Sequence, residues 1–163
     1  MNYLWSPWRM SYIQSPKPQN GCIFCRALEE ADDQKNLILM RGERNFVILN
    51  RYPYTSGHIM IVPMVHLPNL ADLDSSTRAE LMELAAQFVQ VIEDAYHPQG
   101  FNVGINIGEA AGAGVSDHVH MHIVPRWLGD TNFMSTLGMT RVLPESLEDT
   151  FNRLRESWEN LTK

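Results

Sequence analysis

The pattern of apolar and polar positions divides this 163-residue chain into short apolar runs and two longer periodic stretches. Two stretches place apolar side chains at helical spacing, which predicts amphipathic helices at residues 74–96 and 147–161. Ser75 and Ser76 are the expected caps of the first helix, and Pro98 and Gly100 end it. The short runs predict five strands, at residues 37–41, 46–50, 58–63, 101–107 and 118–125.

The order of these elements predicts the fold class and the domain plan. Strands first, one long crossing helix and then further strands are typical of an α+β domain around an antiparallel sheet. The length suits one domain with a sizeable core. We predict an N-terminal arm at 1–20, the main domain at 21–136 and a C-terminal helical extension at 137–163.

The last strand carries the most distinctive chemistry of the chain. His118, His120 and His122 are spaced by two and make up half of the six histidines. Alternate residues of a strand share a face, so we expect a row of imidazoles on one face while the apolar residues between them enter the core. Imidazoles serve as base, nucleophile or metal ligand, so we interpret the row as a chemical surface.

Composition narrows the classes of function. Hydrophobic residues make up 44% and charged residues 20%, as in ordinary globular proteins. A net charge of −6 argues against broad nucleic-acid binding, although it permits a local basic pocket for a phosphorylated ligand. Apolar runs are too short for a membrane span, and the first ten residues lack the apolar core of a secretory signal. We therefore expect a cytoplasmic protein without a membrane partner.

The two cysteines form a single Cys-x-x-Cys pair, Cys22 and Cys25. In a reducing compartment this spacing indicates half of a metal site or a redox pair rather than a structural disulfide. A tetrahedral zinc site needs two more ligands, and His66 is the natural third. The alternative is a pair of reduced, buried cysteines with His66 on the surface.

A small-residue loop precedes the histidine strand and favours one use of the imidazoles. Gly108, Gly112 and Gly114 let backbone amides approach an anion, and Arg126 can add a positive charge. Phosphoryl chemistry requires such donors beside an attacking atom. Nucleophilic catalysis is favoured over a three-histidine metal site, because the outer two positions lie about 13 Å apart along a strand.

These motifs resemble the histidine triad (HIT) family. His118-Val-His120-Met-His122-Ile-Val-Pro is similar to the family signature, His-φ-His-φ-His-φ-φ with φ apolar. Asn50-Arg-Tyr-Pro, followed by Ser-Gly-His58 and an apolar strand, resembles the upstream element. Residues 5–13 and 126–133 look like the diadenosine tetraphosphate phosphorylase and hydrolase branch. The resemblance implies a HIT fold for 21–136 and cleavage of dinucleoside polyphosphates or nucleotide conjugates.

The resemblance also implies a role for each matching residue. His120 would be the nucleophile that forms a covalent nucleotidyl-histidine. His122 would donate to the phosphate or the leaving-group oxygen, and His58 would order the triad. Asn50 matches the position that binds the ribose hydroxyls, and Asn106 matches an amide position near the phosphate.

The chain departs from the family where Gly-Gln-Ser often precedes the triad. Here it reads Gly112-Ala-Gly114-Val-Ser116, so backbone amides or the Ser116 hydroxyl are expected to contact the phosphate. The departure keeps a second interpretation open, in which the protein is a zinc-stabilised nucleotide-binding module with little turnover.

The resemblance completes the metal site as well. A related branch binds structural zinc through two cysteines, a histidine placed like His66 and the first triad histidine. By this resemblance His118 joins Cys22, Cys25 and His66 as the fourth ligand. The resemblance further implies a homodimer with sheets joined across a two-fold axis, and a nucleotide as the small-molecule partner.

Overall fold

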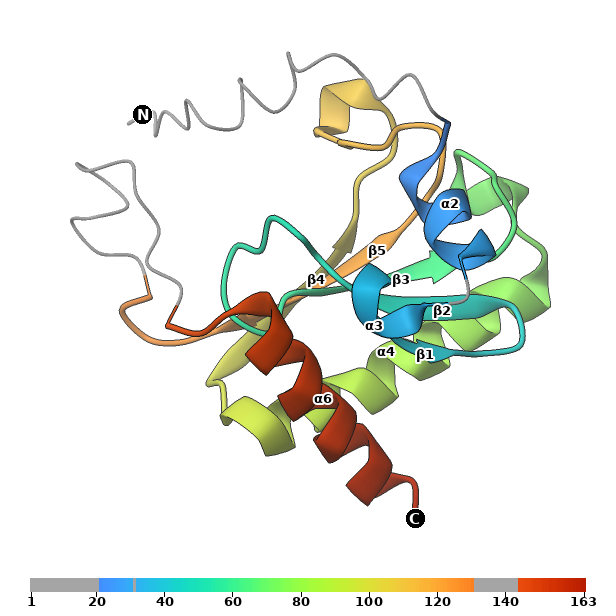
Figure 1. Cartoon of the computed structure of the whole chain (residues 1–163). Coiled ribbons are helices and arrows are strands. Elements are labelled where there is room, and N and C mark those ends of the chain that lie inside the picture. Colours follow the sequence, from blue (N-terminus) through green and yellow to red (C-terminus); the bar gives the residue numbers. More distant parts are fainter. Residues whose placement is uncertain (1–20, 31, 131–143) are drawn as a thin grey trace, which may run out of the picture.

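The computed structural model describes residues 21–30, 32–130 and 144–163. Figure 1 shows one antiparallel sheet, with the long helix α4 and the C-terminal helix α6 against one face. The short helix α2 lies against the other face. The predicted α+β class is confirmed. The predicted N-terminal arm at 1–20 and the predicted boundary at 136 lie outside the described residues.

In the described residues the sheet has five strands in the order β1-β2-β3-β5-β4, and every neighbouring pair is antiparallel. The pairing of β3 with β5 sets Met60 opposite His122, so the chain just before β3 lies beside the triad. Four strands begin and end within two residues of their predicted bounds. The strands are β1 (Ile38–Arg41), β2 (Asn45–Leu49), β3 (Ile59–Pro63), β4 (Gly100–Ile105) and β5 (Met121–Arg126).

The helices follow the predicted periodicity, with one correction at a cap. Asp74, not Ser75 or Ser76, caps α4, because its backbone is extended and its Oδ1 accepts the amide of Thr77 at 2.8 Å. The Cys-x-x-Cys segment forms the start of α2, with Cys22 at the N-cap. The helices are α2 (Ile23–Glu29), α3 (Asp33–Asn36), α4 (Ser75–Tyr96) and α6 (Leu147–Leu161), with short 3-10 turns η1 (Leu70–Asp72) and η2 (Glu109–Ala111).

The sheet is covered on both faces over its central strands. On one face α4 and α6 pack together, and the rings of Phe88 and Trp158 stack with centroids 5.0 Å apart. On the other face Phe24 of α2 packs against alternate residues of β2 and β3. Two-sided burial explains why β2 and β3 are continuous apolar runs rather than alternating ones.

The two edges of the sheet differ. Arg155 of α6 donates to the carbonyl oxygen of Leu39 at 3.0 Å, which occupies part of the β1 edge. Among the described residues β4 pairs with β5 alone, and the side chain of Val103 on β4 is 47% exposed. None of the helices in the described ranges is long and apolar enough to cross a membrane.

Candidate functional site

The triad histidines do not form the exposed row that the sequence suggested. His118 is 0% exposed and His120 is 4% exposed, while His122 is half-buried. Strand β5 begins only at Met121, so the first two histidines precede it. The expectation of an open imidazole face was wrong because Phe24 covers it, with ring centroids 5.4 Å from His118 and 5.0 Å from His120.

His120 is held in one tautomer by a backbone carbonyl. Its Nδ1–H donates to the carbonyl oxygen of His118 at 2.8 Å, and a carbonyl can only accept. The neutral ring therefore carries its lone pair on Nε2. A neutral imidazole with a free lone pair is the form that attacks an electrophile.

Two consecutive hydrogen bonds, through His58, fix the tautomer of His122. The backbone amide of Tyr54 donates to His58 Nδ1 at 3.1 Å, so the proton of a neutral His58 lies on Nε2. That nitrogen is 3.0 Å from His122 Nδ1 and donates to it. His122 then keeps its own proton on Nε2, where it can donate to an oxygen of a substrate.

Burial sets the charge of the two enclosed histidines. Desolvation lowers the pKa of His120 below its ordinary value of 6.5, against the opposing effect of its bond to the His118 carbonyl. Desolvation also lowers the pKa of His118, and the neighbouring His66 and His120 lower it further. Both rings are therefore neutral at physiological pH, as a nucleophile and a metal ligand must be.

The structure brings Asn50 to the triad. Its side-chain nitrogen lies 3.4 Å from His58 Nε2, and its Oδ1 accepts the amide of Tyr52 at 2.9 Å. Asn106 follows the end of β4 and is half-buried. The roles of both residues in nucleotide binding stay predictions.

The glycine-rich loop lies against the face of the sheet that carries Phe24, because Val115 packs into that cluster. Gly112 has a φ of 83°, which favours glycine, and its amide donates to the carbonyl of Glu109 at 2.9 Å. In the described part of the chain the amides of residues 114–116 make no internal hydrogen bond. Ser116 Oγ donates to Asp117 at 3.1 Å. The backbone amides of Gly114, Val115 and Ser116 are therefore available to donate hydrogen bonds to an anion.

Arg126 is a predicted site residue whose side chain is directed to other partners than the triad. Its guanidinium donates to both carboxylate oxygens of Asp130, at 2.6 and 2.9 Å, and to Asn102 at 2.7 Å. It lies four residues beyond His122, about 13 Å along the strand. Its role with phosphate stays a prediction.

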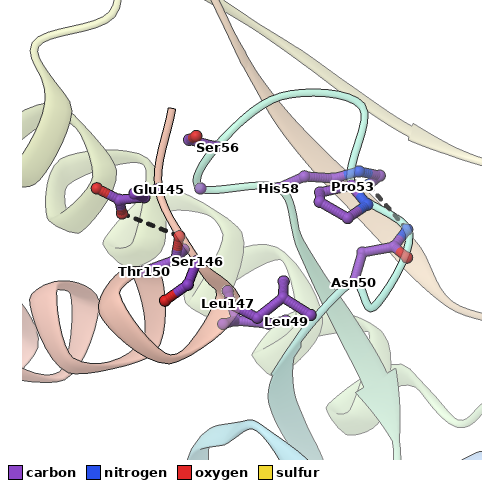
Figure 2. A pocket seen from close by; sticks show the side chains of 10 residues that line it. Leu49, Asn50, Pro53, Ser56, His58, Glu145, Ser146, Leu147 and Thr150 are labelled. Atoms are coloured by element: carbon purple, nitrogen blue, oxygen red, sulfur yellow. Dashed lines mark hydrogen bonds between the residues drawn. The ribbon is translucent and has the colours of Figure 1, made fainter. Parts of the chain in front are cut away.

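A cavity of about 200 Å³ lies between the loop before β3 and the start of α6 (Figure 2). It is smaller than the roughly 300 Å³ at which ligand sites generally begin. Its walls include Asn50 and His58 among the predicted site residues. The lining residues are Leu49, Asn50, Pro53, Ser56, Gly57, His58, Glu145, Ser146, Leu147 and Thr150.

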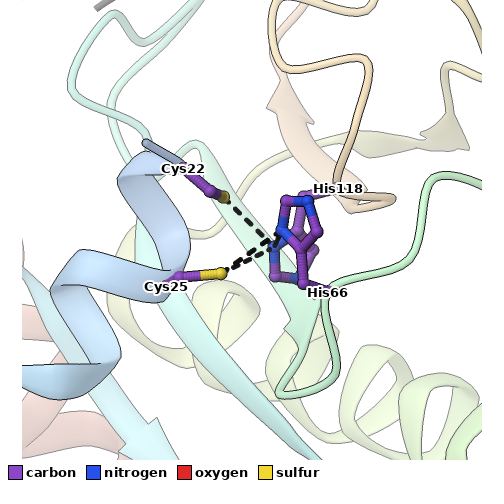
Figure 3. Close-up of side chains that lie close together, drawn as sticks. All are labelled: Cys22, Cys25, His66 and His118. Atoms are coloured by element: carbon purple, nitrogen blue, oxygen red, sulfur yellow. Dashed lines mark hydrogen bonds between the residues drawn. The ribbon is translucent and has the colours of Figure 1, made fainter. Parts of the chain in front are cut away.

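The four predicted metal ligands converge on one point (Figure 3). Cys22 Sγ lies 3.3 Å from His118 Nδ1, and Cys25 Sγ lies 3.3 Å from His66 Nδ1 and 3.7 Å from His118 Nδ1. The two Nδ1 atoms are 3.3 Å apart. Zinc with ordinary bond lengths separates its tetrahedral ligands by roughly 3.3–3.8 Å, so the donor set fits this ion.

The surroundings of the cluster also fit a metal. His118 Nε2–H donates to the carbonyl oxygen of Pro63 at 2.8 Å, which leaves Nδ1 as the lone-pair nitrogen that faces the cluster. Burial and the neighbouring Cys22 thiol raise the pKa of Cys25 to about 11. The Cys25 thiol is therefore protonated without an ion, and metal binding must release its proton.

Two residues of the site were missed by reasoning from sequence. Phe24 contacts His118 and His120, and its position between the two cysteines was the only available signal. Tyr54 contributes its amide to His58 and stacks its ring on the same imidazole, with centroids 4.9 Å apart. A contribution from a backbone amide leaves no signal in residue identity.

Comparison with known proteins agrees with this geometry. The HIT domain model matches residues 31–127. The chain is 38% identical over 162 residues to the "AP-4-A phosphorylase" of Mycobacterium tuberculosis, covering 95% of this chain and 83% of that protein.

Two solved structures are similar over most of their length. The Zn-bound histidine triad family protein from Mycobacterium smegmatis superposes with a TM-score of 0.71 at 26% identity, covering 87% of this chain and 96% of that one. The hypothetical histidine triad nucleotide-binding protein from Sulfolobus tokodaii gives a TM-score of 0.71 at 31% identity, covering 86% and 94%. The histidine triad and its upstream histidine, the fold and these similarities together show that the chain belongs to the HIT domain family.

Proposed function

We propose that this protein is an enzyme that cleaves dinucleoside polyphosphates, such as diadenosine tetraphosphate, through a covalent nucleotidyl-histidine at His120. The observation that carries the proposal is the fixed tautomer of a buried, neutral His120, whose Nδ1–H is bound to the His118 carbonyl at 2.8 Å. The named activity of the similar mycobacterial phosphorylase supports this substrate class.

In the first step His120 Nε2 attacks a phosphorus atom of the polyphosphate chain. An N–P bond forms, and the bond from phosphorus to the bridging oxygen of the leaving polyphosphate breaks. The polyphosphate leaves as an anion, and His122, whose Nδ1 is bound to His58 at 3.0 Å, stabilises that oxygen with a hydrogen bond from its Nε2–H. The free amides of residues 114–116 would stabilise the charge on the non-bridging oxygens.

In the second step an acceptor oxygen, from water or orthophosphate, attacks the same phosphorus atom. The N–P bond breaks and its electron pair returns to Nε2 of His120, while the proton released by the acceptor passes to solvent. Water gives a nucleoside monophosphate, and orthophosphate gives a nucleoside diphosphate. We propose Asn50 as the ligand of the ribose, because it lies 3.4 Å from His58 at the rim of the triad.

The test is to incubate the protein with diadenosine tetraphosphate, with and without orthophosphate, and identify the products. ADP and ATP appearing only with phosphate show phosphorolysis, whereas AMP and ATP show hydrolysis. His120→Asn should lose at least 10³-fold in kcat, about the effect expected when a nucleophile is removed. Nucleotide binding without product, in the folded wild-type protein, would instead favour the nucleotide-binding module.

We also propose that the chain forms a homodimer through the outer edge of β4. The edge exposes Val103, Ile107 is exposed just beyond the end of the strand, and in the described residues no strand lies beside this edge. An open apolar edge is a template for pairing with a second sheet. The domain boundaries at 20 and 136 and a cytoplasmic location stay predictions.

A further inference from the structure

The metal-ligand cluster and the nucleophile meet in a single residue. The ring of His118 directs Nδ1 toward Cys22 and Cys25, while the backbone oxygen of the same residue accepts the Nδ1–H of His120. His118 is fully buried, and its other ring nitrogen is bound to Pro63. A change in the position of this ring therefore moves the carbonyl that selects the tautomer of His120.

A second connection runs through Phe24, which lies between the two cysteine ligands. Its ring packs on His120 with centroids 5.0 Å apart, and its side chain is 2% exposed. When both thiols are held at one point, the backbone between them is fixed and so is this ring. The cluster is thus connected to His120 by two contacts, the hydrogen bond that the His118 carbonyl accepts and the aromatic contact with Phe24.

The segment that carries the cysteines has little stability of its own. Helix α2 has only seven residues, and its N-cap residue Cys22 makes no side-chain capping hydrogen bond. An isolated helix below about 12 residues is marginal in water. The position of α2 on the sheet therefore depends on its tertiary contacts, which include the four-ligand cluster, the burial of Phe24 and Ala27, and the hydrogen bond from Arg41 to the carbonyl oxygen of Leu28 at 3.0 Å.

From this geometry we propose that the Cys22, Cys25, His66 and His118 cluster is a positioning centre for the nucleophile, in addition to any role in overall stability. A metal held by these ligands would fix the His118 carbonyl and the Phe24 ring, and so keep His120 in the Nδ1–H tautomer with Nε2 toward the substrate. The proposal rests on the proposed function of His120 as the attacking group.

A positioning role of the cluster predicts a specific effect of metal loss on the kinetic constants. Asn50, the proposed ribose ligand in the loop before β3, does not contact the cluster in the described structure. Loss of the metal should therefore reduce kcat and leave KM nearly unchanged. Misplacement of a reacting group costs on the order of 10- to 100-fold in rate, and we expect a loss in this range.

The test compares His66→Asn with His97→Asn in the full-length protein. His66 supplies a ligand atom but does not contact His120, so its replacement acts only through the cluster. His97 is an exposed histidine at the end of α4 with a φ of 47°, a conformation that asparagine tolerates. Zinc content, denaturant unfolding and kinetics with diadenosine tetraphosphate are measured for both variants and for the wild type.

The decisive readout is the tautomer of His120, taken from long-range ¹H–¹⁵N spectra of the imidazoles below the unfolding transition. We expect the Nδ1–H form alone in zinc-loaded wild type and His97→Asn, and a mixture of tautomers in His66→Asn and chelated wild type. An unchanged tautomer and kcat in folded, metal-free protein would overturn the proposal. A kcat loss that only tracks the unfolded fraction would overturn it too.

Phe24→Leu provides a variant that keeps all four ligands. It should retain its zinc and lose part of kcat, because the aromatic contact with His120 is gone. Full activity in this variant would contradict the second connection. Failure of the proposed function can be distinguished from failure of this proposal. It would appear as an absence of nucleotidyl-His120 in the zinc-loaded wild-type protein, whichever tautomer His120 adopts.

Discussion

The charge of His120 links its immediate surroundings to the stability of the folded chain. Its pKa in the folded state is lowered by burial, whereas in the unfolded chain the ring titrates near its ordinary 6.5. Above that pH the ring is neutral in both the folded and the unfolded state, so burying His120 does not lower the free energy of unfolding. As the pH falls through 6.5 toward the lowered pKa, only the unfolded state takes up a proton, and the free energy of unfolding decreases.

We therefore expect the stability of the wild-type protein to fall between about pH 7 and pH 5 more steeply than that of His120→Asn, which lacks this group. Denaturant unfolding of both proteins at several pH values measures the two slopes. Parallel slopes would mean that His120 is protonated as readily in the folded state as in the unfolded one.

Helix α4 is joined to the sheet by hydrogen bonds to a carboxylate as well as by apolar packing. Glu80 of α4 accepts the amides of Glu43 and Arg44, at 2.7 and 2.8 Å, in the turn between β1 and β2. It also accepts the side-chain amide of the buried Asn45 at 2.7 Å. Gly42 is required beside it, because a Cβ there would lie 2.7 Å from Glu80 Oε1. One carboxylate thus holds the hairpin onto the helix.

Replacing Glu80 with glutamine should destabilise the fold by about 1–3 kcal/mol, because one acceptor oxygen becomes a donor that faces other donors. Burial alone would raise the pKa of Glu80, but its hydrogen bonds from Asn45 and the turn amides lower it overall. The contribution of Glu80 is present above the ordinary value of 4.5 and is lost as the pH falls through the lowered pKa.

Thermal and denaturant unfolding at neutral pH measure this effect. Glu83→Gln is the matched control, since Glu83 is an exposed residue of the same helix whose contact is with Gln87 on that helix. An equal, small change in both variants would show that the turn does not depend on Glu80.

At the scale of the whole molecule, the two edges of the sheet differ within the described residues, because α6 contacts the β1 edge and no strand pairs with the outer edge of β4. Arg155 occupies part of the β1 edge, whereas β4 exposes backbone and apolar side chains together. The homodimer proposed above would cover this open edge and continue the sheet into a second copy.

A lysine at position 103 should prevent such pairing, because it puts a charge on the exposed strand. We expect wild type and Met82→Lys to sediment as dimers, and Val103→Lys as a monomer. Met82 is an exposed apolar residue of α4, 58% accessible and away from the β4 edge, so it controls for the added charge. A monomeric wild-type protein at micromolar concentration would refute the dimer.

The sequence alone determined the elements and the identity of the chemical groups. Five strands and two long helices follow from local periodicity, because a helix or a strand repeats its buried face within a few residues. The ligand types of the metal cluster and the candidate nucleophile were also identified from sequence, through the Cys-x-x-Cys pair and the resemblance to the HIT family.

Tertiary structure decided how those groups are used. The burial of His118 and His120 comes from Phe24, which lies more than ninety residues earlier in the chain. The tautomers are set by the Tyr54 amide and the His118 carbonyl, and Arg126 is turned to Asp130 instead of the triad. Desolvation and backbone hydrogen bonds depend on which distant segments meet, and no local pattern of residue types encodes that.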